Sequence, residues 1–227
     1  MKRFIIVSAL CATFAFLGCQ ETKEDEKIPL AEKDLYKKIG EEIPFETGME
    51  WIALYQGKNN AQGRTESDSG YHVPSAEMNQ LLESVSDLTG VAFHYGIDEA
   101  GQNHIIVIPV DGSLDVWSSA GNKFVVDANT GTQISEEVAL SWSNNFKQAN
   151  PASIWFHFFG KDVFDEMRAL PYYNNISIER AISSLDLTPQ LLLVVWNEEQ
   201  VSSSGRTQAL FGSVYDASNA CPPCAAI

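Results

Sequence analysis

Two of the four cysteines stand close enough together for thiol chemistry. Cys221 and Cys224 form a Cys-Pro-Pro-Cys sequence, which has the C-x-x-C spacing that thiol–disulfide enzymes use. Such enzymes lower the pKa of the attacking thiol with a helix that begins at the pair. Only Ala-Ala-Ile follows Cys224, so we favour an inert disulfide between the two cysteines. A thiol–disulfide enzyme is the alternative.

The histidines show no spacing that is typical of a metal site. The chain has four of them, His72, His94, His104 and His157, and none falls in a His-Glu-x-x-His pattern or near a cysteine pair at zinc-finger distance. The nucleophile turn Gly-x-Ser-x-Gly and the phosphate-binding glycine loops are also missing from the sequence. His94 lies on the less apolar face of an alternating strand, and we expect a hydrogen-bonded structural histidine that faces solvent or a helix.

The carboxylates are numerous but stand where side chains usually face solvent. Glu136 and Glu137 fall in the first turn of an expected helix, where they complement the helix dipole. Asp162, Asp165 and Glu166 crowd another helix, and we find no pair of acids isolated among apolar residues for acid–base work. We therefore expect no catalytic residue, no metal and no cofactor, and a hydrolase without a recognisable motif stays open.

The overall charge limits the partners. The chain has 15 Lys and Arg against 30 Asp and Glu, a formal net charge of -15. Lys2 and Arg3 precede Cys19 and no acid does, so a chain starting at Cys19 would keep 13 basic and 30 acidic side chains, a net charge of -17. Such a body repels phosphate groups, so we expect no nucleic-acid partner and no long-range attraction to anionic lipid.

The N-terminus has the layout of a signal peptide. Lys2 and Arg3 are followed by an uncharged apolar run, residues 4–17. This run is shorter than the ~20 residues that a membrane-spanning helix needs, but it has the length of a signal-peptide core. A buried N-terminal helix is the less favoured alternative, because the run has no polar face.

The residues after this run resemble the lipobox of bacterial lipoproteins, in which a small residue precedes an invariant cysteine. Leu17, Gly18 and Cys19 match the pattern, whereas Phe16 stands where leucine is usual. The resemblance implies cleavage before Cys19 and lipid, including palmitate, on Cys19. Gln20, rather than Asp, follows the cysteine, which by the same resemblance favours the outer membrane. The acidic residues 21–27 are similar to the surface-export tethers of Bacteroidota, although a plain spacer is the alternative.

These signals divide the chain into four parts. We expect a signal peptide over residues 1–18, a charged tether over 19–42, a first α+β unit over 43–133 and a second over 134–227. The tether is charged, poor in aromatic residues and interrupted by Pro29.

Hydrophobic periodicity predicts the same order of elements in both units: helix, strand, helix, strand, strand. The first unit begins with a helix that Thr47 and Glu50 would cap. The second begins with a helix capped by Ser135 and ended at Asn150-Pro151. We therefore predict an α+β fold of two similar halves, mainly antiparallel, with helices on one face.

The two units align by pattern alone. The alignment places Trp51 with Trp142, Met78 with Phe164, Phe93 with Ile178 and Val107 with Leu192. A degenerate duplication explains this match, and two unrelated α+β stretches explain it equally well. Residues 149–171 and the Cys-Pro-Pro-Cys tail also resemble small envelope proteins of Bacteroidota. That resemblance implies a source and a fold but carries no activity.

Overall fold

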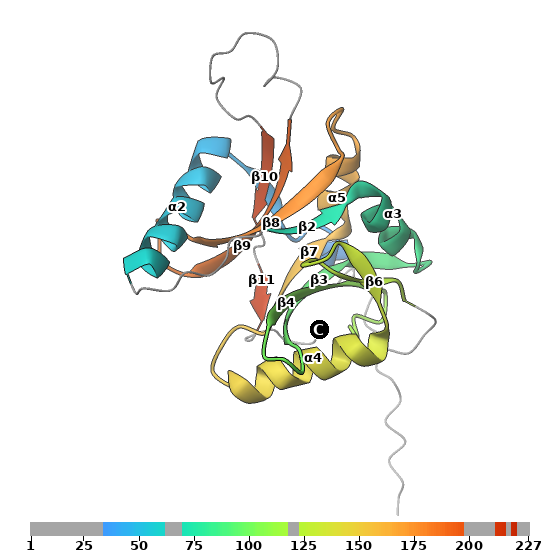
Figure 1. Cartoon of the computed structure of the whole chain (residues 1–227). Coiled ribbons are helices and arrows are strands. Elements are labelled where there is room, and N and C mark those ends of the chain that lie inside the picture. The colour runs from blue at the N-terminus through green and yellow to red at the C-terminus, as the bar shows by residue number, and fades with distance from the viewer. Residues whose placement is uncertain (1–33, 62–69, 118–122, 198–211, 217–218, 222–227) are drawn as a thin grey trace, which may run out of the picture.

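The computed structural model describes residues 34–61, 70–117, 123–197, 212–216 and 219–221. Its strands form two antiparallel sheets. The two long helices lie on different sides of the molecule, one over each sheet (Figure 1). The predicted α+β class is confirmed.

The two halves repeat the same order of elements. The first half runs through β1 (Glu41–Ile43), α2 (Phe45–Ala61), β2 (Tyr71–Pro74), α3 (Ser75–Glu83), β3 (Leu88–Ile97), β4 (Asn103–Asp111) and β5 (Val125–Asp127). The second half runs through β6 (Thr132–Ile134), α4 (Glu136–Ala149), β7 (Phe156–Gly160), α5 (Lys161–Arg168), β8 (Asn175–Ile182), β9 (Pro189–Trp196) and β10 (Gly212–Asp216), and β11 (Asn219–Cys221) follows. The predicted order is thus present in both halves, with one further strand before it and one after it.

The two halves exchange strands. The five-stranded sheet has the order β1-β10-β9-β8-β2, and the six-stranded sheet has the order β11-β7-β3-β4-β5-β6. In the five-stranded sheet, β10, β9 and β8 of the second half lie between β1 and β2 of the first half. In the six-stranded sheet, β3, β4 and β5 of the first half lie between β7 and β6 of the second half, and β11 is an additional edge strand. The halves are therefore intertwined, and neither completes a sheet with its own strands.

The strand register repeats as well. In one sheet Val73 of β2 pairs with Ile176 of β8, and in the other Phe159 of β7 pairs with Val91 of β3. Each residue of the first half has its counterpart 85 or 86 positions later, because 73 + 86 = 159 and 91 + 85 = 176. This agreement in register favours a duplication over two unrelated stretches.

One position of the sequence alignment is wrong by a single residue. Phe93 pairs with Val107 in the β3–β4 hairpin, and Ile178 pairs with Leu193 in the β8–β9 hairpin. The counterpart of Val107 is therefore Leu193, not Leu192. A shift of one residue moves a strand side chain to the other face of its sheet. Val107 and Leu193 lie in the core between the sheets, whereas Leu192 packs on the opposite face with Trp51.

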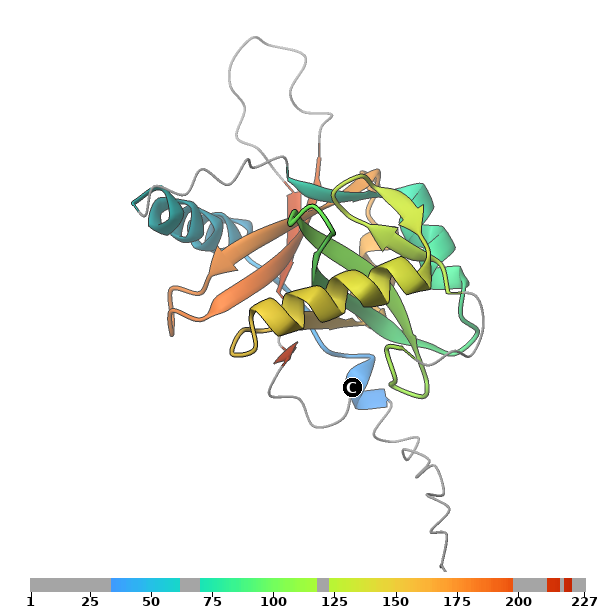
Figure 2. The same ribbon diagram turned by 60° about the horizontal axis from the view of Figure 1, so that its bottom comes forward.

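Three apolar cores hold the layers together. The central core contains inward-facing residues of both sheets and the buried sides of α3 and α5, including Met78 and Phe164. A second core contains residues of the six-stranded sheet and of α4, which lies across its strands (Figure 2). A third joins α2 to the outer face of the five-stranded sheet. Both sheets are thus covered on both faces.

Two local predictions near helix starts had different outcomes. Ser135 caps α4 as expected, because its Oγ accepts a hydrogen bond from the Val138 amide at 3.3 Å. The predicted capping box of Thr47 and Glu50 is wrong, since α2 begins at Phe45 and contains both residues. The helix starts earlier because Pro44 precedes it, and the Pro44 carbonyl accepts from the Gly48 amide at 3.1 Å.

A close approach between the two halves depends on a glycine. A Cβ at Gly90 would lie 2.2 Å from the Phe159 carbonyl oxygen and 2.4 Å from the ring of Phe158. We expect Gly90→Ala to lower the free energy of unfolding by about 3 kcal/mol, measured by urea denaturation, because the strands must move apart. Gly57→Ala is the control, since a Cβ at that position would meet nothing within 4 Å. Replacing this helical glycine by alanine should raise the free energy of unfolding by about 0.5–1 kcal/mol. Equal effects of the two substitutions would contradict this account.

Candidate functional site

Two clusters of polar side chains are at least partly buried in the described body. The histidine cluster consists of Asp98, His104, Asp127 and Trp142. The arginine cluster consists of Arg180 with Tyr55, Tyr71 and Tyr95. Both clusters join elements from different halves of the chain.

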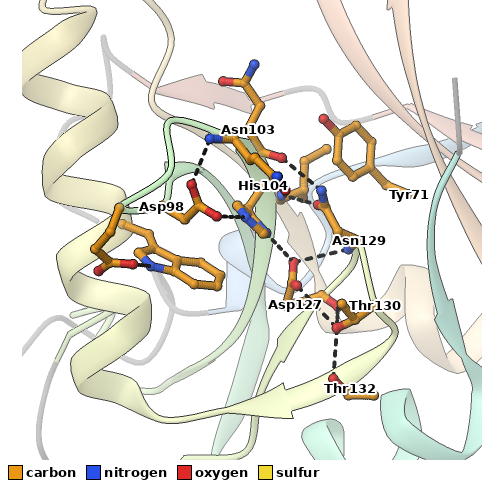
Figure 3. Close-up of polar contacts among 12 residues, drawn as sticks. Tyr71, Asp98, Asn103, His104, Asp127, Asn129, Thr130 and Thr132 are labelled. Carbon is orange, nitrogen blue, oxygen red and sulfur yellow. Dashed lines mark hydrogen bonds and ion pairs between the residues drawn. The ribbon is translucent and has the colours of Figure 1, made fainter. Parts of the chain in front are cut away.

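The histidine cluster lies where the β3–β4 hairpin meets the turn after β5 (Figure 3). His104 is 7% exposed at the start of β4. Its Nδ1 lies 3.0 Å from Oδ1 of Asp127, and its Nε2 lies 3.4 Å from Oδ2 of Asp98. The second contact has ion-pair distance without hydrogen-bond geometry. The imidazole thus lies between two carboxylates.

The face of the imidazole is covered by the other half of the chain. The ring of Trp142, on α4, lies 4.1 Å from the His104 ring between centroids, at an angle of 31°. The indole Nε1 of Trp142 donates to Glu99 at 3.2 Å, which fixes the indole over the hairpin turn. Tryptophan therefore shields the histidine from solvent on one side.

Both oxygens of the Asp127 carboxylate accept hydrogen bonds from its own turn. Its Oδ1 accepts from the Asn129 amide at 3.1 Å, and its Oδ2 accepts from the Thr130 hydroxyl at 3.2 Å. Across the cluster, a hydrogen bond from the Gln102 amide, and secondly the contact with His104, lower the pKa of Asp98. The Gln102 hydrogen bond and the nearby imidazole thus stabilise the ionised carboxylate of Asp98.

This geometry is that of a bridge rather than of a catalytic base. A histidine base needs one ring nitrogen directed at the group from which it takes a proton. Here both nitrogens of His104 face carboxylates. The nearby hydroxyl of Thr130 is already bonded to Asp127 and Thr132 (Figure 3). The cluster ties the first hairpin to the turn that connects the two halves.

The arginine cluster connects α2, β2, β3 and β8. The Nη1 of Arg180 donates to the Tyr55 hydroxyl and its Nη2 to the Tyr71 hydroxyl, each at 3.2 Å. The guanidinium also lies over the rings of Tyr71 and Tyr95, 5.4 and 5.5 Å from their centroids. Burial lowers the pKa of Arg180, but the surrounding tyrosines outweigh burial and raise it. Arg180 therefore stays cationic and binds aromatic groups by cation–π contacts.

Two histidines are buried without a hydrogen bond among the described residues. His94 is 1% exposed and His157 is 0% exposed, and both ring nitrogens of each lack a partner there. Burial lowers the pKa of His157 to about 4. Burial, and secondly the charge of Lys147, lower that of His94 to about 3.

The expectation of a hydrogen-bonded His94 is wrong. Its imidazole is stacked on Phe156, 4.5 Å away between centroids, and meets the edge of Trp117 at 5.2 Å. The face of β3 that carries His94 is covered by α4, so it does not reach solvent. His94 fills an aromatic layer as a neutral ring.

Two of the three cysteines predicted to carry lipid or a disulfide lie outside the described residues. Cys19 and Cys224 fall there, and Cys221 ends β11, where its backbone pairs with Phe156. The lipid attachment and the disulfide stay predictions. Within the described residues, no group of His, Cys, Asp or Glu could hold a metal ion. The same residues contain no helix with the length and apolar character needed to cross a membrane.

Sequence reasoning missed both polar clusters. Asp98 and Asp127 stand 6 and 23 positions from His104, separations that correspond to no motif. The available signal was a turn rich in Asp, Asn and Thr directly after a short strand. Compared with known proteins, the chain matches no family model, no curated protein and no solved structure.

Proposed function

We propose that this chain is a lipid-anchored protein of the bacterial cell envelope with a binding or interaction role. The proposed anchor rests on three features that follow one another at the N-terminus: Lys2-Arg3, the apolar residues 4–17 and Leu17-Gly18-Cys19. Acyl chains on one cysteine anchor a protein stably without a spanning helix, at about 0.8 kcal/mol for each buried CH₂ group. The acidic body then stands at the membrane surface, on the outer membrane.

One observation supports an interaction role over catalysis. The imidazole of His104 has both nitrogens directed at carboxylates and one face against Trp142. Among the described histidines, His104 most resembles a base with an orienting acid, but its contacts hold the β3–β4 hairpin against the turn after β5. Recognition through exposed apolar side chains, such as Leu185 and Leu187, fits the body better than proton transfer at this site.

The anchor is tested by removing the lipid-carrying thiol. We expect Cys19→Ala to abolish acylation and to move the protein from the membrane fraction to the soluble envelope fraction. Without the Cys19 thiol no lipid is attached, so the whole apolar anchor is lost. Intact mass and fractionation of cells expressing the full chain measure the change.

Cys11→Ala is the matched control, because this cysteine lies inside the apolar run without the preceding Leu-Gly pair. It should leave acylation and membrane fractionation unchanged. If Cys19→Ala protein still fractionates with membranes, and wild-type protein carries no acyl mass, the proposed anchoring is wrong.

A further inference from the structure

The turn between β8 and β9 repeats the hydrogen bonds of the turn between β3 and β4. In the first turn Asp98 accepts a bond from the Ala100 amide at 2.9 Å, and its own amide donates to the Gln102 carbonyl at 3.0 Å. In the second, the Ser183 hydroxyl accepts from the Leu185 amide at 3.2 Å, and the Ser183 amide donates to the Thr188 carbonyl at 3.0 Å. The two turns therefore correspond at both ends, although the second is one residue longer: Ser183 and Thr188 are five positions apart, whereas Asp98 and Gln102 are four.

The helices above these turns repeat the same contact. Trp142 of α4 donates its indole N–H to Glu99 at 3.2 Å, and Trp51 of α2 donates to the Ser184 hydroxyl at 3.1 Å. Glu99 and Ser184 are counterparts, because 99 + 85 = 184. Corresponding positions of the two turns should therefore place the same conformational demand on their residues.

One position of the second turn breaks this rule. Gly101 has a φ of +82°, and its counterpart is Leu187, with a φ of +61°. Both residues donate their amide back to the first turn residue, Gly101 to Asp98 and Leu187 to Ser183. A left-handed conformation suits glycine and strains a leucine. Leu114, the other described non-glycine residue with a positive φ, is 2% exposed and packs in a core, whereas the Leu187 side chain is exposed. Packing therefore does not explain the leucine at position 187, and its strain points to a functional requirement for the side chain.

The strained leucine belongs to an apolar tip. We define the leucine tip as residues 183–188. Its Leu185 is 87% exposed and its Leu187 is 72% exposed, more than any other large apolar side chain among the described residues. Asp186 between them turns its carboxylate to the Thr188 amide and hydroxyl, at 3.1 and 2.7 Å. The tip projects from the body beside α2 (Figures 1 and 2).

We propose that the leucine tip inserts into the headgroup region of an uncharged lipid bilayer and orients the anchored body on the membrane. This inference rests on the proposed function, because the anchor supplies the bilayer. Residues 20–33 join Cys19 to the described body, and at about 3.5 Å per residue they reach no farther than roughly 50 Å. The anchor therefore keeps the body, and the tip with it, near the bilayer surface.

The anchor makes so small a contact sufficient. Burial of a leucine side chain favours the apolar phase by roughly tenfold or more. Two leucines would hardly hold a free protein on a membrane. A tethered body meets the bilayer at an effective concentration in the millimolar range, so weak contacts become populated. The net charge of -17 on the chain from Cys19 onward selects uncharged over anionic lipid.

Photocrosslinking of the lipidated full chain in phosphatidylcholine vesicles tests the proposal. A benzophenone amino acid replaces either Leu185 or its counterpart Ala100, which is the matched control. We expect at least tenfold more lipid adduct from position 185 than from position 100, measured by mass spectrometry. Equal adduct yields at the two positions, or a crosslink from position 185 to a second copy or to another protein, would overturn the proposal.

A second measurement avoids the bulky probe. Amide hydrogen exchange of residues 183–188 should be slower in the vesicle-anchored wild type than in the Cys19→Ala body. The anchored Leu185→Ser/Leu187→Ser variant should lose this protection, and its retention there would also overturn the proposal. Intact mass and vesicle flotation report acylation separately. Acylated protein that floats but shows no tip contact refutes the tip alone, whereas absent acylation refutes the anchor and the tip with it.

Discussion

Asp127→Ala should lower the free energy of unfolding by about 2 to 4 kcal/mol, because it leaves buried hydrogen-bond donors without their acceptor. The Asp127 carboxylate is 2% exposed and accepts bonds from the His104 ring, the Asn129 amide and the Thr130 hydroxyl. Its removal leaves His104 facing one carboxylate at a longer distance. It also removes the hydrogen bonds that hold the turn between β5 and β6, which connects the two halves. Urea denaturation at neutral pH measures the loss.

Asp165→Ala provides the comparison. Asp165 forms an ion pair with Lys161 one helical turn away, with half of its side chain exposed. An exposed pair of this kind contributes less than about 1 kcal/mol. If Asp127→Ala costs no more than Asp165→Ala, His104 is not the bridge described above, and its site would be open to another role.

The sequence predicted the elements well because each element is encoded locally. The helix of α4 has a serine cap, a Trp142-containing apolar stripe and an Asn-Pro end, and all three signals lie within or beside its own residues. The β3 and β4 strands are similarly marked by their apolar density. The start of α2 was misplaced because the turn at Pro44 competed with a stronger-looking box at Thr47.

The exchange of strands could not be predicted from one sequence. Whether β2 pairs with β3 or with β8 depends on which sheet offers it a free edge, and both offer the same apolar pattern. Conversely, the alignment of the halves erred at Val107 because Leu192 and Leu193 are equally apolar. Only the register of the β8–β9 hairpin decides which of them faces the central core.

The exchange also explains why His94 is buried without a hydrogen-bond partner among the described residues. The face of β3 that carries it was expected to meet solvent or a helix, and it meets a helix. Here α4, from the other half, covers that face, and Phe156 of β7 lies directly opposite His94 in the sheet. A polar residue on the less apolar side of a strand was therefore buried by a partner that the sequence of its own half does not contain.

The two neutral histidines should make the fold sensitive to acid. In the unfolded chain a histidine titrates near 6.5, whereas the folded values are about 3 for His94 and about 4 for His157. Below pH 6.5 the unfolded chain therefore binds more protons than the folded one, and stability falls as the pH falls. The loss begins near pH 6.5 and ends only below the folded pKa values. At pH 4.5 it reaches about 5 kcal/mol for the two residues together, a large part of the stability of a small domain.

Substitution by an apolar ring should remove this sensitivity stepwise. We expect urea denaturation of the wild type between pH 6 and 4.5 to show uptake of about two protons from these sites on unfolding. His94→Phe and His157→Phe should each remove about one of them. Neither should destabilise the fold at pH 7, because each ring already packs among aromatic residues, Phe156 and Tyr95 respectively, and no described hydrogen bond is lost. The double variant should keep nearly the whole neutral-pH stability at pH 4.5 as far as histidine is concerned. An unchanged slope in the double variant would show that other groups, and not these buried imidazoles, control the acid response.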